Sequence, residues 1–300
     1  MSDYVKKRIT DLFAEGKFLC AESVLKVISE AGGKDSDDFI RMATGFCSGA
    51  ARTKGQCGAV SGAIMGIGLF AGRSRIDGDY EAAYALTQEF ITRFAERFDS
   101  LNCFELIGCD FATHEGKVRF KKENLRRKCH EYSTFAVEMS LELLRENGYV
   151  PSHEDFIKSR LAPCGLSCGK CLAYADGSIR QLSAGLASEL GDNFGVYAQR
   201  FAGMNPVFRE YASFRKLLDY LSQGTCTGCR ETGCLFKDCK VPSCVRENGV
   251  DYCHQCGEFP CDRHGMPDGL APRWLVNNEK MRDIGVDAWF DGCREKPRYS

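Results

Sequence analysis

The sequence lacks an excess of charge of either sign, because its 40 lysine and arginine residues are balanced by 41 aspartate and glutamate residues. Proteins that bind nucleic acid or anionic membranes usually carry a basic surface, so we expect no nucleic acid partner. A Rossmann or P-loop fingerprint is also missing, so a nucleotide cofactor would have to come from a partner. The N-terminal residues lack the apolar core and cleavage site of a secretory signal, which predicts a cytoplasmic protein.

Long apolar runs are scarce as well. The uncharged segment 55–72 is nearly long enough to span a bilayer, but Gln56, Ser61 and many small residues lower its hydrophobicity. A second segment that would support a membrane-spanning interpretation is missing. We therefore expect a soluble protein with no membrane partner.

Cysteine, in contrast, is abundant, with 18 in 300 residues. Six precede residue 150 and twelve follow it, and residues 147–152 carry the glycine and proline of a helix end and a short linker. This change in composition predicts two domains, residues 1–150 and 151–300. Structural disulfides are rare in the cytosol, so clustered cysteines there indicate metal ligands or redox-active thiols.

Both halves are predicted to be mostly α-helical. In the first half apolar residues recur at helical spacing without an alternation of period two, which predicts an all-α bundle. The expected helices of this bundle cover residues 20–30, 37–44, 79–98 and 129–145, around the segment 55–72. In the second half, which we expect to be helical and rich in loops, helices are predicted at residues 178–190, 193–202 and 208–221.

The segment 55–72 is the feature around which the first half is organised. Gly58, Gly62 and Gly66 recur every four residues, so in a helix they share one face that admits a close neighbour. That face is also a candidate contact between the subunits of a homo-oligomer. Cys57 lies at the start of this helix, where the macrodipole and two nearby cations favour a thiolate. The alternative is a small, buried core cysteine.

Residues 15–147 resemble the redox-active C_GCAxxG_C_C family. The residues that carry the resemblance are Cys20 at a helix start, the run CGAVSG from Cys57, then Cys103, and Cys129 at the start of the last helix. Glutamine precedes the central cysteine here, where the family has glycine, and Cys47 and Cys109 are additional. The resemblance implies a helical domain with redox-active cysteines. We expect the reactive set to be Cys57, Cys20, Cys103 and Cys129, although four converging cysteines would serve equally to bind one metal ion.

The second half opens with the spacing C-x3-C-x2-C at Cys164, Cys168 and Cys171. Lys170 precedes the last of these, where radical SAM enzymes usually have an aromatic residue, and the remaining chain has too few strand signals for their barrel. The fourth Cys-Pro of the bacterial ferredoxin pattern is missing at short range. Histidine follows none of the C-x2-C pairs, which argues against attached haem.

Eight cysteines crowd residues 226–261, among glycines and prolines that predict loops. The pairs Cys226-x2-Cys229 and Cys253-x2-Cys256 have the spacing with which tetrahedral zinc sites grip their ion. The cysteines of this half that we expect to bind metal are Cys164, Cys168, Cys171, Cys226, Cys229, Cys234, Cys239, Cys244, Cys253, Cys256 and Cys261. Cys293 lies apart and is unassigned, and His254 and His264 are expected to be solvated.

Residues 160–293 resemble the DUF3795 family through the runs APCGLSCGKC, CHQCGEFPC and IGVDAW. The resemblance implies a zinc-binding, cysteine-rich domain. Three functions stay open: a cytosolic redox protein whose first half exchanges thiols and disulfides with a redox partner, an iron–sulfur electron carrier, and a non-enzymatic metal-binding or interaction protein. Zinc and iron–sulfur clusters share thiolate ligands, so residue type alone does not separate them, and zinc is the preferred expectation.

Overall fold

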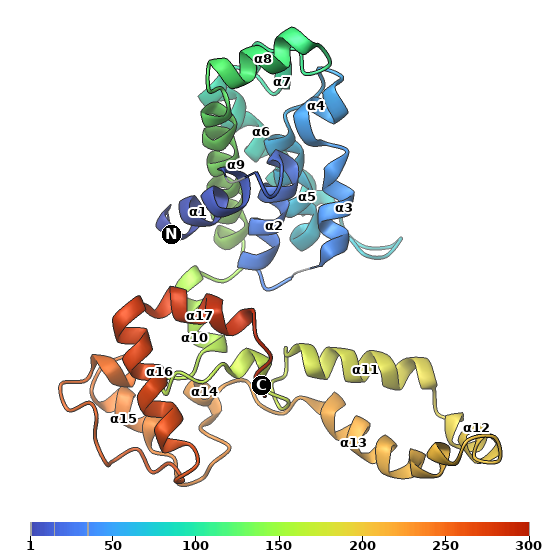
Figure 1. Ribbon diagram of the computed structural model, residues 1–300, viewed down its shortest axis with the longest axis vertical. Helices are drawn as coiled ribbons and strands as arrows, with labels where there is room; N and C mark the ends of the chain where they lie inside the picture. The colour runs from blue at the N-terminus through green and yellow to red at the C-terminus, as the bar shows by residue number, and fades with distance from the viewer. Residues whose placement is uncertain (1, 15, 35, 300) are drawn as a thin grey trace. The chain divides into compact units, whose positions relative to one another are not determined.

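The computed structural model describes residues 2–14, 16–34 and 36–299 and is almost entirely helical (Figure 1). Within those residues the only extended pairings are isolated bridges, so the predicted mostly-α fold is confirmed. The chain forms two compact units, unit 1 up to Phe156 and unit 2 from Ile157 onward. Helix α10 (His153–Arg160) contains the boundary. In the described residues no helix combines the length and the apolar character that a membrane span requires.

Unit 1 is a helical bundle around α2 and α5. Its helices are α1 (Ser2–Ile9), α2 (Cys20–Ala31), α3 (Asp37–Thr44), α4 (Cys47–Arg52), α5 (Gly58–Ala71), α6 (Glu81–Phe98), α7 (Cys103–Ile107), α8 (His114–Lys122) and α9 (Arg126–Glu146). Helices α2, α5 and α9 pack against one another. The predicted apolar face of α2, with Val24, Leu25 and Ile28, is buried as its helical spacing requires.

The glycine face of α5 lies directly against α2. A Cβ atom added at Gly62 would stand 2.7 Å from the carbonyl oxygen of Ala21, and one at Gly66 would stand 2.7 Å from the side chain of Ile28. The three glycines therefore allow the two helices to approach within the distance that any side chain would block. The predicted close neighbour is a helix of the same chain, so this face does not supply a contact between subunits.

Helix α4 contains a left-handed turn that the sequence analysis did not predict. Residues 48–52 all have positive φ, between +51° and +72°, and only one of them is glycine. The left-handed conformation costs about 1–2 kcal/mol for each non-glycine residue, so surrounding contacts must hold it. The amide of Gly55 donates to the carbonyl of Gly49 at 3.1 Å, and the Thr53 hydroxyl donates to the carbonyl of Ala50 at 2.8 Å.

Unit 2 combines helices with cysteine-bearing loops. Its helices after α10 are α11 (Ser178–Leu190), α12 (Phe194–Phe201), α13 (Tyr211–Gln223), α14 (Cys229–Thr232), α15 (Val241–Glu247), α16 (Ala271–Ile284) and α17 (Val286–Arg294), with short 3-10 turns at Cys168–Lys170, Pro206–Glu210 and Cys253–Gln255. Helices α11 and α13 pair along their length (Figure 1). The helix predicted at 208–221 is instead a 3-10 turn followed by α13, and the loops predicted among the later cysteines are present.

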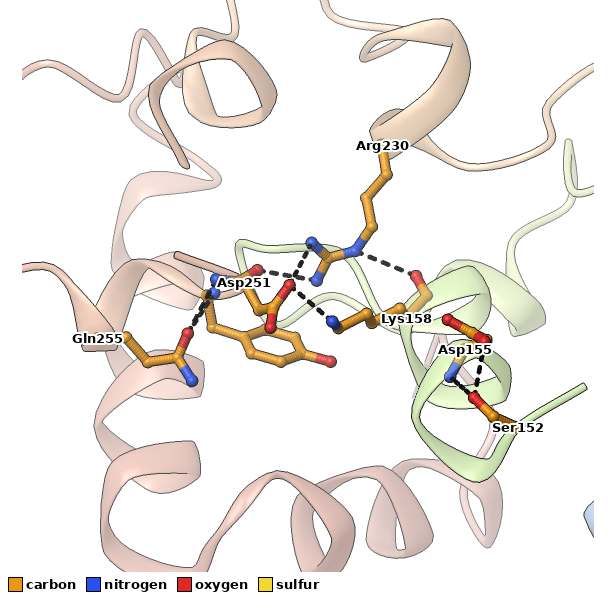
Figure 2. A network of polar contacts seen from close by, with 7 residues as sticks. Ser152, Asp155, Lys158, Arg230, Asp251 and Gln255 are labelled. Atoms are coloured by element: carbon orange, nitrogen blue, oxygen red, sulfur yellow. Dashed lines mark hydrogen bonds and ion pairs between the residues drawn. The ribbon is translucent and has the colours of Figure 1, made fainter. Parts of the chain in front are cut away.

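Hydrogen bonds and ion pairs hold the loops of unit 2 in place, because its apolar core is small. Figure 2 shows Arg230 of α14 donating to the carbonyl of Lys158 at 3.2 Å and to that of Asp251 at 2.8 Å. The carboxylate of Asp251 pairs with the Lys158 ammonium at 2.9 Å. The side-chain oxygen of Gln255 accepts a hydrogen bond from the Asp251 backbone amide at 2.9 Å. Because Arg230 follows Cys229 and Asp251 precedes Cys253, this network fixes two of the cysteine-bearing segments.

Candidate functional site

All four cysteines predicted to be reactive in unit 1 line one cavity of about 80 Å³. They come from distant parts of the chain, since Cys20 begins α2, Cys57 caps α5, Cys103 begins α7 and Cys129 lies in the first turn of α9. Aromatic side chains surround the thiols, namely Phe13, Phe111, Phe120 and Tyr132. The fold therefore gathers these thiols in a largely apolar site.

Backbone hydrogen bonds place Cys57 and Cys103 side by side. The Cys57 amide donates to the carbonyl of Leu101 at 2.8 Å, and the Cys103 amide donates to that of Gly55 at 3.0 Å. The side chain of Asn102 caps α7 by accepting from the amides of its first turn. These bonds fix the start of α5 against the start of α7, and with them two walls of the cavity.

Cys20 carries the thiol whose pKa is lowered in unit 1. A hydrogen bond from the Cys47 thiol and the backbone amides of Ser48 and Ala21 bring the pKa of Cys20 to about 7, although burial opposes them. The neighbouring Cys20 and burial raise the pKa of Cys47 in return, and its thiol donates a hydrogen bond to the carbonyl of Ala43 at 3.7 Å. The left-handed turn supplies the Ser48 amide, so its strained backbone serves this thiolate directly.

Cys47 is a neighbour of Cys20 that the sequence did not predict. It is 3% exposed and comes from α4, 27 positions after Cys20. In the sequence, Cys47 stands out only as a cysteine additional to the four of the family pattern. Pairing it with Cys20 required the path of the chain through α3 and α4, which short-range spacing does not encode.

The expectation that Cys57 carries the thiolate is not supported by its surroundings. Burial raises its pKa to about 12, the Cys20 thiolate adds to this rise, and the amides at the start of α5 only partly offset it. Lys54, one of the two cations expected to help, pairs instead with the carboxylate of Asp110 at 2.9 Å. Burial likewise raises the pKa of Cys103 to about 12 and that of Cys129 well above its usual range. Of these four thiols, Cys20 alone has a lowered pKa.

Unit 2 divides its predicted metal ligands between two cavities. The larger, of about 1070 Å³, is lined by Cys164, Cys168, Cys171, Cys226, Cys229, Cys234 and Cys239, and also by Cys293. The smaller, of about 20 Å³, is lined by Cys244, Cys253, Cys256 and Cys261. Together the two cavities account for all eleven cysteines and add Cys293, which the sequence analysis left unassigned.

Thiols of the larger cavity contact one another in pairs. A hydrogen bond from Cys229 lowers the pKa of Cys168 to about 7, and one from Cys239 lowers the pKa of Cys234 to about 6. The donors Cys229 and Cys239 have raised pKa values in return. These segments are joined by the backbone too, because Ala173 and Ala175 exchange hydrogen bonds with Cys226 at 2.9 Å each.

The smaller cavity has the donor set of a mononuclear zinc site. Four thiols surround a space close to the volume of a single atom, which fits the tetrahedral thiolate coordination of structural zinc. As the side chains stand, however, no three His, Cys, Asp or Glu groups within the described residues are placed to hold a metal ion. Coordination would therefore require the thiols to turn toward the centre of this cavity.

The two histidines have partners other than a metal. His254 lies beside Tyr252 with ring centroids 5.9 Å apart, and its amide donates to Asn278 at 3.0 Å. The ring of His264 packs on Trp274 and accepts from the Met266 amide at 2.9 Å. Both rings are half-buried and therefore only partly in contact with solvent.

Comparison with known proteins yields one family match for each unit. Residues 18–143 match the family described as "Putative redox-active protein (C_GCAxxG_C_C)". Residues 160–266 match the family "Protein of unknown function (DUF3795)". Both resemblances are thus confirmed. No curated protein and no solved structure matches the chain. The C_GCAxxG_C_C match covers Cys20, Cys47, Cys57, Cys103 and Cys129, so all four cysteines that line the cavity of unit 1 lie within the matched residues.

Proposed function

We propose that unit 1 is a dithiol–disulfide oxidoreductase in which Cys20 attacks and Cys47 resolves. The observation that supports this most is the packing of Cys20 against the apolar cluster that contains the buried Cys47, which also lowers the pKa of Cys20 to about 7. Thiolate character and a second cysteine within reach are the requirements of disulfide exchange. Cys20 is part-exposed and lines the cavity, whereas Cys47 is buried behind it.

The proposed reaction reduces a substrate disulfide. The Cys20 thiolate attacks one sulfur, the substrate S–S bond breaks, and a mixed disulfide forms as the other sulfur leaves as a thiolate. Cys47 gives up its proton to that leaving thiolate and attacks the Sγ atom of Cys20, which breaks the mixed disulfide and releases the second substrate sulfur as a thiolate. The products are a Cys20–Cys47 disulfide, one substrate thiol and one substrate thiolate that takes its proton from water, so two electrons pass to the substrate. A dithiol of a redox partner returns the pair to its reduced form and is itself oxidised to a disulfide, which suits a reducing compartment such as the cytoplasm.

Oxidation of the reduced protein should therefore form a Cys20–Cys47 disulfide first in unit 1. The measurement is brief treatment with diamide, alkylation of the remaining thiols, and mass spectrometry of the proteolytic peptides. Cys109→Ser is the matched control, because Cys109 is a buried cysteine of unit 1 outside the cavity lining. It should leave the disulfide yield unchanged, whereas Cys47→Ser should remove the linkage. A first disulfide between Cys57 and Cys103 would contradict this assignment.

For unit 2 we propose a structural zinc ion at the smaller cavity, held by Cys244, Cys253, Cys256 and Cys261. Bound zinc would supply four thiolate–metal bonds that tie α15 to the loop after Cys253. The apolar cluster here is small, with Val241, Val245 and Trp274 among its few members, so metal ligation would add folding free energy where burial adds little.

Replacing Cys256 with serine is accordingly expected to lower zinc content by about one ion per chain and to lower the melting temperature of unit 2. Zinc is measured by elemental analysis of protein purified without added metal, and melting by calorimetry. Cys109→Ser should retain the zinc. Wild-type protein free of zinc after purification and after incubation with zinc would sink this assignment.

A further inference from the structure

The larger cavity of unit 2 has an unusual charge pattern. Eight thiols line it together with four cationic side chains, those of Arg273, Lys280, Lys296 and Arg298. Among the described residues that form its lining, none is Asp, Glu or His. Thiolates would give the cavity negative charge, and the four cations offset that charge. The cavity is therefore suited to several thiolates with a negatively charged ligand bound between them.

The cavity is much larger than a single metal ion requires. Its volume of about 1070 Å³ is some fifty times that of the smaller cavity, which already has four thiols of its own. Cavities of this size hold polyatomic ligands or cofactors. Much of the remaining wall is apolar, including Leu235, Phe236 and Trp289, and would exclude water from the occupant.

We propose that this cavity binds an iron–sulfur cluster through four of its neighbouring thiols Cys164, Cys168, Cys229, Cys234 and Cys239, whose side chains would have to turn toward one centre. Cysteine thiolates in groups of four are the usual ligands of four-iron clusters. An organic anion would be held by the cations alone and would leave the convergence of eight thiols without a role. This inference goes beyond the thiol exchange of unit 1 and does not depend on it.

Several of the eight thiols lie near one another. Cys229 neighbours Cys168, and Cys239 neighbours Cys234. Cys164 lies near all four of them. The remaining thiols of the lining, Cys171, Cys226 and Cys293, belong to the same cavity.

The main experiment is anaerobic purification of the full chain, followed by reconstitution with ferrous iron and sulfide. We expect about four or more iron atoms and as many acid-labile sulfides per chain, a brown colour, and an electron paramagnetic resonance signal after reduction with dithionite. Protein that stays colourless, that binds only zinc, or that retains iron without labile sulfide would overturn the proposal.

Variants locate the cluster and separate it from the other sites. The double variant Cys168→Ser, Cys229→Ser should lose at least half of the bound iron, whereas Cys20→Ser and Cys109→Ser should keep it all. Retention of full iron and sulfide by the double variant would place the cluster elsewhere and refute the assignment. Loss of disulfide formation in unit 1 with full iron content would refute only the proposed oxidoreductase.

A second test does not depend on removing a ligand. Lys280 lines the cavity, and a cation favours the reduced, more negative state of a cluster. Lys280→Gln should therefore shift the reduction potential of the reconstituted protein to more negative values, measured by a titration followed with electron paramagnetic resonance. Lys216→Gln is the matched control, because Lys216 is exposed on α13 away from the lining. Equal potentials in both variants and the wild type would argue against the cluster site.

Discussion

Replacing Cys20 with serine is expected to lower the fastest alkylation rate within unit 1 at pH 7 by about fifteen-fold or more. A thiol with a pKa of about 7 is half ionised at that pH, whereas an ordinary thiol is about 3% ionised, and thiolate is the reactive form. The rate is measured peptide by peptide with iodoacetamide under native conditions. In the wild type, the Cys20 rate should rise with pH, pass its midpoint near pH 7 and then level off.

Cys57→Ser provides the comparison for that experiment. Burial keeps the Cys57 thiol protonated at neutral pH, so its removal should change the alkylation of Cys20 little. Cys47→Ser should shift the midpoint of the Cys20 profile upward, because the largest cause of the lowered pKa is the hydrogen bond from Cys47. A wild type in which Cys57 reacts faster than Cys20 would restore the expectation drawn from its place at a helix start.

Replacing Gly62 with alanine is expected to destabilise unit 1 by roughly 1–3 kcal/mol. The added Cβ would stand 2.7 Å from the carbonyl oxygen of Ala21 and 3.0 Å from Val24, both on α2. Backbone cannot yield as a flexible side chain does, so α2 and α5 would have to separate. Alanine has a higher helix propensity than glycine, which stabilises α5 by up to about 1 kcal/mol. The net loss of stability is therefore smaller than the cost of the steric overlap alone.

Gly68→Ala is the matched control on the same helix. A Cβ at Gly68 meets nothing within 4 Å, so this variant should be neutral or stabilised by up to about 1 kcal/mol. Both variants are compared with the wild type by denaturant unfolding followed by far-ultraviolet circular dichroism. Equal midpoints for Gly62→Ala and Gly68→Ala would show that the close approach of α2 and α5 is not needed for stability.

Periodicity in the sequence was enough to predict most helices of both units. The predicted ranges 37–44 and 178–190 coincide with α3 and α11, because apolar spacing and a following glycine mark both their faces and their ends. The close neighbour of Gly62 and Gly66 was also predictable, since repeated glycines in a buried helix have few other uses. Which helix it would be was not, because α2 and α3 were both available.

The thiol chemistry was less accessible from sequence. The position of Cys57 at a helix start favoured a thiolate, but its burial is a property of the packed bundle and outweighs the dipole. Cys20 has the same position at a helix start and gains two partners, Cys47 and Ser48, that only the left-handed turn brings to it. In unit 2 the spacing of cysteines identified the pairs but not their division between two cavities, which depends on how the loops fold over α16 and α17.

The left-handed turn lowers the stability of unit 1 but supports the reactivity of Cys20. Substitutions that would relax residues 48–52 into a right-handed helix would lower the local strain, and selection for thermostability alone would favour them. They would also withdraw the Ser48 amide and move Cys47 from the sulfur of Cys20. A more robust variant of this protein obtained at that turn would thus be a slower thiol reagent, so directed evolution of unit 1 should screen for both properties together.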